Sequence, residues 1–196
     1  MTESEILTQL KNDLDENRYL HTLGVAFTAT SMAMKYGVDI QKAYIAGLLH
    51  DCAKCIPKDK QIQMCKENNI YLDEGELNAP QLIHSKLGAF LAKSKYGIQD
   101  EEILSAIEKH TTGDADMTPL EMIIFTADYI EPHRDKAVNL AQVRSLAFTD
   151  LKAATFKILS DTIDYLKSKN ADIYYKTFDA YEYLNINNNK EVNPWI

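Results

Sequence analysis

An apolar run that ends in an imidazole and a carboxylate is the stretch of this sequence best suited to chemistry. Gly47, Leu48 and Leu49 are followed directly by His50 and Asp51. The leucines belong in a core, and a charge at the margin of a core is costly to desolvate without a partner. A divalent metal ion would suit both side chains, because imidazole nitrogen and carboxylate oxygen are common ligands of such ions. The pair alone is weak evidence, so further ligands must come from elsewhere in the chain.

Three more histidines and one isolated aspartate can complete such a site. His21, His84 and His110 fall within or at the end of expected helices, and Asp128 interrupts an otherwise apolar helix. Taken singly, each is more often a hydrogen-bonded or exposed residue, or a cap. Taken together, they follow one another on successive helices, and helical bundles build metal sites from inward-facing side chains of this kind.

The elements that must position these residues are helices. Glycine and proline are scarce, apolar residues recur near every 3.6 positions, and no convincing alternating strand is present, so the expected fold is all-α. Capping-box patterns begin the helices near Thr2 and Thr118. The stretch 69–79 is expected to be irregular, the helical pattern loosens after Pro132, and the tail 185–196 is expected to be frayed. Helices are expected over about 2–13, 16–36, 40–52, 57–68, 80–96, 100–110, 118–130, 149–169 and 172–184.

Length and charge limit the classes of function. With 196 residues, the chain is expected to form one domain, with a core over about 16–134 and C-terminal helices over about 137–184. The net charge of −8 argues against broad binding to nucleic acid or to an anionic membrane, but not against a small anionic ligand. Three cysteines and a polar N-terminus without a signal-peptide pattern predict a cytoplasmic protein, and no apolar stretch is long enough to span a bilayer.

Three local strings then resemble one known family. Residues 18–25 (RYLHTLGV), 47–54 (GLLHDCAK) and 127–134 (ADYIEPHR) are similar to the YqeK-like branch of the HD superfamily of metal-dependent phosphohydrolases. The resemblance covers about 18–134. It implies an HD-type helical bundle with a C-terminal helical extension. It also implies a symmetrical hydrolase that splits diadenosine tetraphosphate into two ADP through a metal-bound hydroxide.

The same resemblance implies the site residues. One divalent metal, expected to be iron with manganese, cobalt or zinc as alternatives, would be held by His21, His50, Asp51 and Asp128. Residues with an implied catalytic role are Asp51, Lys54, His84 and His110. Residues implied to contact the nucleotide are His21, Gly24, Lys54, His84, His110, Thr111, Asp128, Tyr129, Ile130, Glu131 and Arg134.

The roles of His84 and His110 remain open at this level. They can contact phosphate when protonated, donate a proton to the leaving group, or bind a second metal. Phosphate contact is favoured, because a second metal would need a bridging carboxylate and only Asp51 is at hand. His133 is expected to be a surface residue.

Other functions are carried as alternatives. An HD-type nucleoside monophosphate phosphatase, a cyclic-nucleotide phosphodiesterase, a non-catalytic nucleotide sensor and a di-iron oxygenase would each use a related scaffold. Cys52 and Cys55 form a C-x-x-C pair, but neither a βαβ pattern nor a second pair accompanies it. Four tyrosines between 174 and 183 are expected to pack the last helix, with homodimer formation as the alternative.

Overall fold

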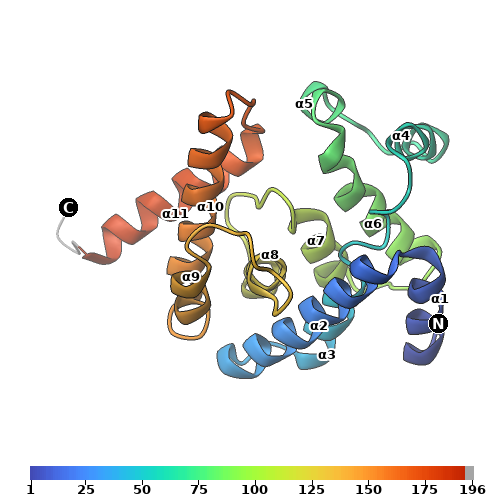
Figure 1. Ribbon diagram of the computed structural model, residues 1–196, viewed down its shortest axis with the longest axis horizontal. Coiled ribbons are helices and arrows are strands. Elements are labelled where there is room, and N and C mark those ends of the chain that lie inside the picture. The colour runs from blue at the N-terminus through green and yellow to red at the C-terminus, as the bar shows by residue number, and fades with distance from the viewer. Residues whose placement is uncertain (193–196) are drawn as a thin grey trace.

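All regular secondary structure that the computed structural model describes, residues 1–192, is helical (Figure 1). Side chains are described through residue 186. The all-α expectation is therefore confirmed. The helices in chain order are α1 (Glu3–Asp13), α2 (Glu16–Tyr36), α3 (Ile40–Leu49), α4 (Lys58–Glu67), α5 (Glu74–Asn78), the 3-10 helix η1 (Pro80–Leu82), α6 (Ile83–Ser94), α7 (Glu101–Lys109), α8 (Pro119–Ile130), α9 (Leu140–Leu146), α10 (Leu151–Ser168) and α11 (Tyr175–Val192).

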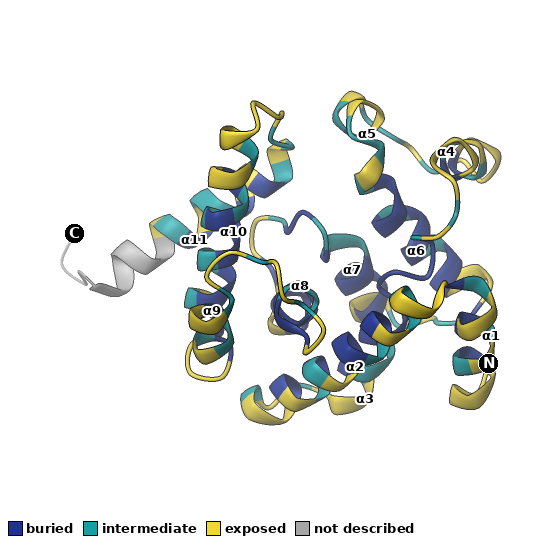
Figure 2. Cartoon of the chain, viewed as in Figure 1, coloured by how far each residue is buried: buried dark blue, intermediate teal, exposed yellow. Residues whose placement is uncertain are grey.

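Helix α8 lies at the centre of the bundle. It packs against α2, α3 and α7 on one side and against α9 and α10 on the other. Its apolar sequence, from Leu120 to Ile130, is buried nearly all round (Figure 2). A helix that is apolar on every face must be covered on every face. Thr118 and Glu121 form a reciprocal capping box at its N-terminus. Packing of α8 against α2 brings the C-terminal end of α8 beside that helix, which places Asp128 and Glu131 next to His21.

Most predicted helices are found close to their expected limits, but α3 is shorter than expected. It ends at Leu49 instead of near Cys52, and residues 50–55 continue as tight turns. Backbone hydrogen bonds there join residues three apart, from Cys52 N to Leu49 O (3.1 Å) and from Lys54 N to Asp51 O (2.9 Å). The turns direct His50 and Asp51 into the bundle.

Two short helices were not delimited from the sequence. Helix α5 lies in the stretch 69–79 that was expected to be irregular, and it begins with a capping box formed by Asp73 and Glu76. Helix α9 lies where the pattern loosens, and it begins after Asn139 in the left-handed region at φ 54°. Helices of five and seven residues show little periodicity in a sequence, which explains why neither was delimited.

The C-terminal helix is longer than expected. The tail was expected to be frayed from residue 185, but α11 continues to Val192, and residues 193–196 lie outside the described part of the chain. Tyr174 donates to Asp73 Oδ2 (2.7 Å), Tyr183 donates to Asp116 Oδ1 (2.7 Å), and Tyr181 stacks on Phe156, so three of the four C-terminal tyrosines pack the chain onto its body. No described helix is long and apolar enough to cross a membrane.

Candidate metal centre and pocket

Five helices bring their histidines and aspartates to one point. His21 lies on the second turn of α2, His50 and Asp51 directly follow α3, and His84 lies on the first turn of α6. His110 ends α7, and Asp128 lies on the last turn of α8. Their ligand atoms form three overlapping groups, in each of which all atoms lie within 4.8 Å of one another. The structure thus brings together all the side chains that the sequence pattern singled out for metal binding.

The first half of this cluster contains two imidazoles and two carboxylates. His21 Nε2 lies 3.0 Å from Asp128 Oδ1 and 3.3 Å from His50 Nε2. His50 Nε2 lies 3.4 Å from Asp51 Oδ2. Two ring nitrogens and two carboxylate oxygens therefore face a common point, which is a ligand set for a divalent cation.

The second half faces the other oxygen of Asp51. Asp51 Oδ1 lies 3.1 Å from His84 Nε2 and 3.5 Å from His110 Nε2. The two ring nitrogens are themselves 3.2 Å apart. Asp51 is consequently placed between the two pairs of histidines, with one oxygen turned toward each pair.

The other nitrogen of every ring is already engaged. In His50, His84 and His110, Nδ1 lies 2.7 Å from the backbone carbonyl of the residue three positions earlier. In His21, Nδ1 lies 3.0 Å from Glu131 Oε1. A carbonyl only accepts hydrogen bonds, so the proton resides on Nδ1 and Nε2 presents its lone pair. Metal-ligating histidines are oriented in this way in proteins.

One buried atom of the cluster has no hydrogen-bond partner among the described residues. Asp51 Oδ1 is within reach of two rings but forms no hydrogen bond of acceptable geometry. Buried carboxylate oxygens are rarely left without a partner, and the facing lone pairs of His84 and His110 repel each other unless a positive charge lies between them. These donors fit a divalent metal ion.

The charges of the cluster are set by burial and by its own members. Burial would raise the pKa of Asp51, but the neighbouring imidazoles of His50, His110 and His84 hold it well below the usual range. Burial would also raise the pKa of Asp128, and His21, His50 and Arg134 lower it in the same way. Both carboxyl groups are therefore ionised and ready to bind a cation.

Burial has the opposite effect on the second histidine pair. It lowers the pKa of His84 to about 4, against the influence of Asp51. His84 is thus neutral near pH 7, and the expected phosphate contact through a protonated His84 does not apply to this arrangement. The positive charge beside this histidine pair is that of Lys54, whose Nζ lies 3.1 Å from His84 Nε2. Burial lowers the pKa of Lys54 as well.

Two arginines hold the carboxylates of the cluster. Arg134 donates to Asp128 Oδ1 (2.7 Å) and was expected at the phosphates. Arg18 donates to Asp51 Oδ2 (2.6 Å) and was given no role from the sequence. Its position three residues before His21, on the same face of α2, is the signal that would have identified it.

Two residues expected at the nucleotide lie elsewhere. Ile130 is buried and does not line the pocket beside the cluster. Gly24 is buried against Glu131: a Cβ atom at Gly24 would lie 2.4 Å from Glu131 Oε2. The glycine therefore makes room for a side chain of the protein and not for a nucleotide.

Glu131 and His133 both line the pocket. Glu131, which was expected at the sugar or base, is buried, and its Oε1 faces His21. His133 is 59% exposed at its side chain, in keeping with a surface residue, but it lines the pocket and its backbone N–H donates to Glu131 Oε2 (2.7 Å).

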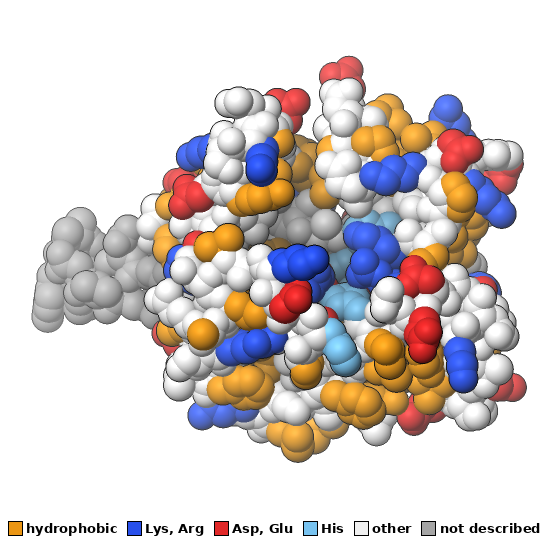
Figure 3. All heavy atoms as spheres, in the orientation of Figure 1, with side chains coloured by type: hydrophobic (Ala, Val, Ile, Leu, Met, Phe, Trp, Pro, Cys, Tyr) orange, Lys and Arg blue, Asp and Glu red, His pale blue; other side chains and the backbone are white. Residues whose placement is uncertain are grey.

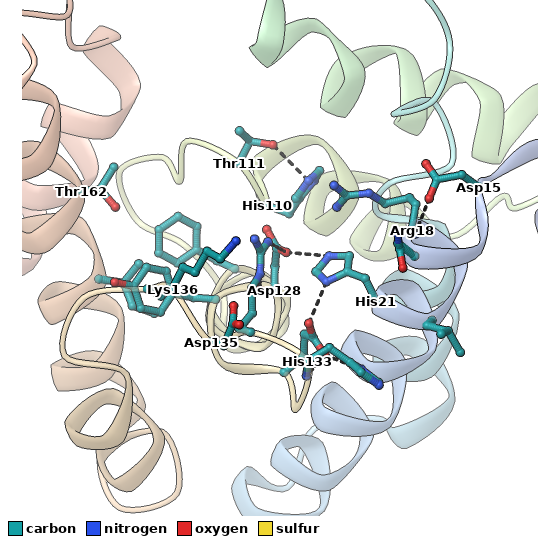
Figure 4. A pocket seen from close by; sticks show the side chains of 18 residues that line it. Asp15, Arg18, His21, His110, Thr111, Asp128, His133, Asp135, Lys136 and Thr162 are labelled. Carbon is teal, nitrogen blue, oxygen red and sulfur yellow. Dashed lines mark hydrogen bonds and ion pairs between the residues drawn. The ribbon is translucent and has the colours of Figure 1, made fainter.

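A pocket of about 820 Å³ opens onto this cluster. His21, His110, Thr111 and Asp128 line its polar side, and Thr111 Oγ1 lies 3.0 Å from His110 Nε2 (Figure 4). The remaining wall includes Leu20, Phe125, Tyr129 and Ile158. Lysine, arginine and histidine side chains gather around the central hollow of this face (Figure 3). The volume is in the range of small-molecule sites and suits a nucleotide.

The thiols take no part in this centre. Cys52 is buried, and burial raises the pKa of its thiol to about 12. Burial also raises the pKa of the exposed Cys55. A reactive or metal-binding thiol needs a lowered pKa, so the C-x-x-C pair is not a redox or zinc site.

Comparison with known proteins identifies the family of this metal-binding fold. The HD domain family matches residues 18–133, which include all six clustered residues and therefore both halves of the centre. The chain belongs to the HD domain family.

The similarity to several relatives extends over nearly the whole length of this chain. It is 40% identical to a symmetrical bis(5′-nucleosyl)-tetraphosphatase of Bacillus subtilis, over 94% of this chain and 98% of that protein. It is also 40% identical to one of Halalkalibacterium halodurans, over 94% and 97%. A crystal structure of an HD superfamily hydrolase from Clostridium acetobutylicum, described as involved in NAD metabolism, superposes with a TM-score of 0.91 at 40% identity, over 94% and 97%.

Proposed function

We propose that this HD protein is a metal-dependent hydrolase that splits diadenosine tetraphosphate symmetrically into two ADP. The observation that carries the proposal is the position of Asp51 between two pairs of histidines, in a cluster whose His21, His110 and Asp128 line a nucleotide-sized pocket. The names of the full-length relatives support the same reaction.

Four side chains would hold the metal: His21, His50, Asp51 and Asp128. Iron is the proposed metal, with manganese, cobalt and zinc compatible with the same donors. A divalent cation bound there would lower the pKa of a water molecule and offset charge on a phosphoryl oxygen. Glu131 fixes the ring of His21, and the arginines Arg18 and Arg134 fix the two carboxylates.

The second half of the cluster would face the phosphate chain. Lys54 supplies positive charge beside His84, and Thr111 places a hydroxyl at the same point. The short Lys54–His84 contact allows a proton to be held between Nζ and Nε2, next to the oxygen that leaves with ADP. His84 and His110 would serve phosphate contact by orienting Lys54 Nζ and Thr111 Oγ1, because their own Nε2 atoms present lone pairs. The position of Asp51 Oδ1 would also suit a second cation, and metal content distinguishes the two assignments.

The test combines metal analysis with product analysis. Protein purified without added metal is expected to hold about one iron per chain and to convert diadenosine tetraphosphate into ADP alone. Two metals per chain would move His84 and His110 into metal binding. Inorganic phosphate as a product would favour a monophosphatase, and tight binding without any product would favour a sensor.

Replacement of Asp51 tests the mechanism in the same assay. Asp51→Asn keeps the shape but removes the charge that faces both pairs of histidines, so turnover is expected to fall by at least about a thousandfold. Asp59→Asn, an exposed aspartate of α4, is the control. Undiminished turnover in a folded Asp51→Asn protein would overturn the proposed mechanism.

The proposal also covers a cytoplasmic location and the formation of a homodimer. The three cysteines are free thiols, which fits the reducing cytoplasm. Tyr175 and Phe178 expose apolar rings on α11, and a homodimer through this helix stays a prediction that the molar mass in solution will test.

A further inference from the structure

One cation of the pocket has no partner within the described part of the chain. Arg18, Arg134 and Lys54 are each held by a residue of the ligand cluster. Lys136 lines the same pocket, is exposed, and forms no hydrogen bond or ion pair with a described residue. Its side chain extends into the pocket toward Asp128 (Figure 4). An unpaired ammonium beside a phosphohydrolase centre is free to bind a phosphate of the substrate.

Lys136 also stands at the entrance to a second cavity. This side cavity has a volume of about 260 Å³ and lies between α10 and the segment that follows α8. Its walls include Val138 and Tyr165, neither of which lines the main pocket. The side cavity lies directly beside the main pocket, because four residues line both: Tyr129, Lys136, Ala137 and Thr162.

The segment 131–139 that forms this wall is held at both ends. Arg144 donates to the backbone carbonyls of Ile130 (2.9 Å), Glu131 (2.9 Å) and Arg134 (3.0 Å). At the other end, Asn139 Nδ2 donates to Asp161 Oδ1 (3.0 Å). The Tyr129 hydroxyl donates to the carbonyl of Val138 (2.8 Å). The backbone that carries Lys136 is therefore anchored, although its side chain is free.

The proposed reaction needs a second nucleoside site. Symmetrical cleavage cuts the middle of a tetraphosphate, so equal halves of the substrate extend on either side of the bond that breaks. The main pocket can hold one half beside the cluster, and the other half needs a place of its own next to it. The side cavity adjoins the main pocket, and the unpaired cation lies at the boundary between the two.

We propose that the side cavity binds the second nucleoside of the dinucleoside substrate, an inference that rests on the proposed function. Lys136 contacts the phosphates as the chain passes between the two cavities. Tyr165, whose ring is 54% exposed, offers a face on which a base can stack. The hydroxyl of Thr162, at the boundary, is available to the ribose.

Two substrates separate this role from a general effect on catalysis. Diadenosine tetraphosphate carries both nucleosides, whereas adenosine 5′-tetraphosphate carries one nucleoside and the same four phosphates. Tyr165→Ala is expected to raise KM for the first about tenfold, with kcat little changed, and to leave the second unaffected. Lys136→Ala is expected to raise KM for both about tenfold, because both carry the phosphates.

Matched controls lie away from both cavities. Tyr71→Ala removes an exposed tyrosine, and Lys60→Ala removes an exposed lysine of α4. Neither should change KM for either substrate. If Tyr165→Ala raises KM for both substrates alike, or for neither, the second-nucleoside site is overturned while the proposed function stands. A parent protein that leaves diadenosine tetraphosphate intact overturns the proposed function, and with it this site.

Discussion

Gly24 and Glu131 show how one side chain can set the orientation of a metal-binding imidazole. Gly24→Ala would place a Cβ 2.4 Å from Glu131 Oε2 and push the carboxylate away from His21. Loss of such an orienting partner lowers metal affinity by roughly 10–100-fold. We therefore expect this drop in a titration of metal-free Gly24→Ala with iron or manganese, monitored by calorimetry.

A second glycine provides the control for that experiment. At Gly88, on α6, a Cβ would meet nothing closer than 3.5 Å. Gly88→Ala should bind metal as the parent does and stabilise α6 by up to about 1 kcal/mol, because alanine favours the helix. Equal metal affinities in the two variants would contradict the role given to Gly24.

The buried His84 makes the metal-free protein sensitive to acid. Its pKa falls from 6.5 to about 4 on folding because burial disfavours the charged ring. Between these values the unfolded chain binds a proton that the folded chain does not, so stability rises with pH across this window and is lost as pH falls. The loss from this residue should approach about 3 kcal/mol near pH 4.

Urea unfolding of the metal-free protein between pH 7 and pH 4.5 measures this effect. His84→Gln should show a shallower dependence on pH than the parent, because the titrating ring is gone. His133→Gln removes a mostly exposed ring and is the matched control. The same pH dependence in the parent and in His84→Gln would argue against a buried neutral His84.

At the scale of secondary structure elements, α9 acts as an anchor for the segment that follows α8. Arg144 donates to two carbonyls of that segment, those of Glu131 and Arg134, and to the carbonyl of Ile130 at the end of α8. Arg144→Met removes these charge-assisted hydrogen bonds and should destabilise the protein by about 1–3 kcal/mol. Amide hydrogen exchange over 131–139 should become faster, since the backbone is released from one end.

Gln142→Met is a matched change on the same helix. Its side chain is exposed, so neither stability nor exchange over 131–139 should change. If Arg144→Met leaves the exchange of this segment at the rate of the parent, then α9 does not hold it.

At the scale of the whole molecule, the metal would join helices that are far apart in the sequence. The four proposed ligands come from α2, from the turn after α3 and from α8, so binding needs the folded bundle. A metal that binds only the folded state stabilises it by about 4 kcal/mol at a thousandfold excess over Kd. For a chain of this size that raises Tm by roughly 10 °C.

Thermal unfolding with and without a chelator measures this linkage. Chelation should lower the Tm of the parent protein, and Asp51→Asn should abolish most of the difference because it removes the carboxylate shared by both histidine pairs. Asp59→Asn should keep the difference in full. A Tm that is independent of metal in the parent would contradict a resident cation.

The sequence alone determined the all-α class, most helix limits and the residues of the metal cluster. Caps, helical periodicity and residue types are local properties, so Thr118, Gly37 and the run ending at His50–Asp51 can be interpreted without a fold. The short helices α5 and α9 carried too few residues for such a pattern.

Only the tertiary structure decided which atoms meet. It placed Asp51 between two histidine pairs, turned Glu131 toward His21, and brought α10 beside the segment of Lys136 to form the side cavity. These are contacts between residues as much as 110 positions apart. They depend on how helices pack and on which ring nitrogen a distant carboxylate or a turn carbonyl engages, and no local pattern in a chain encodes that geometry.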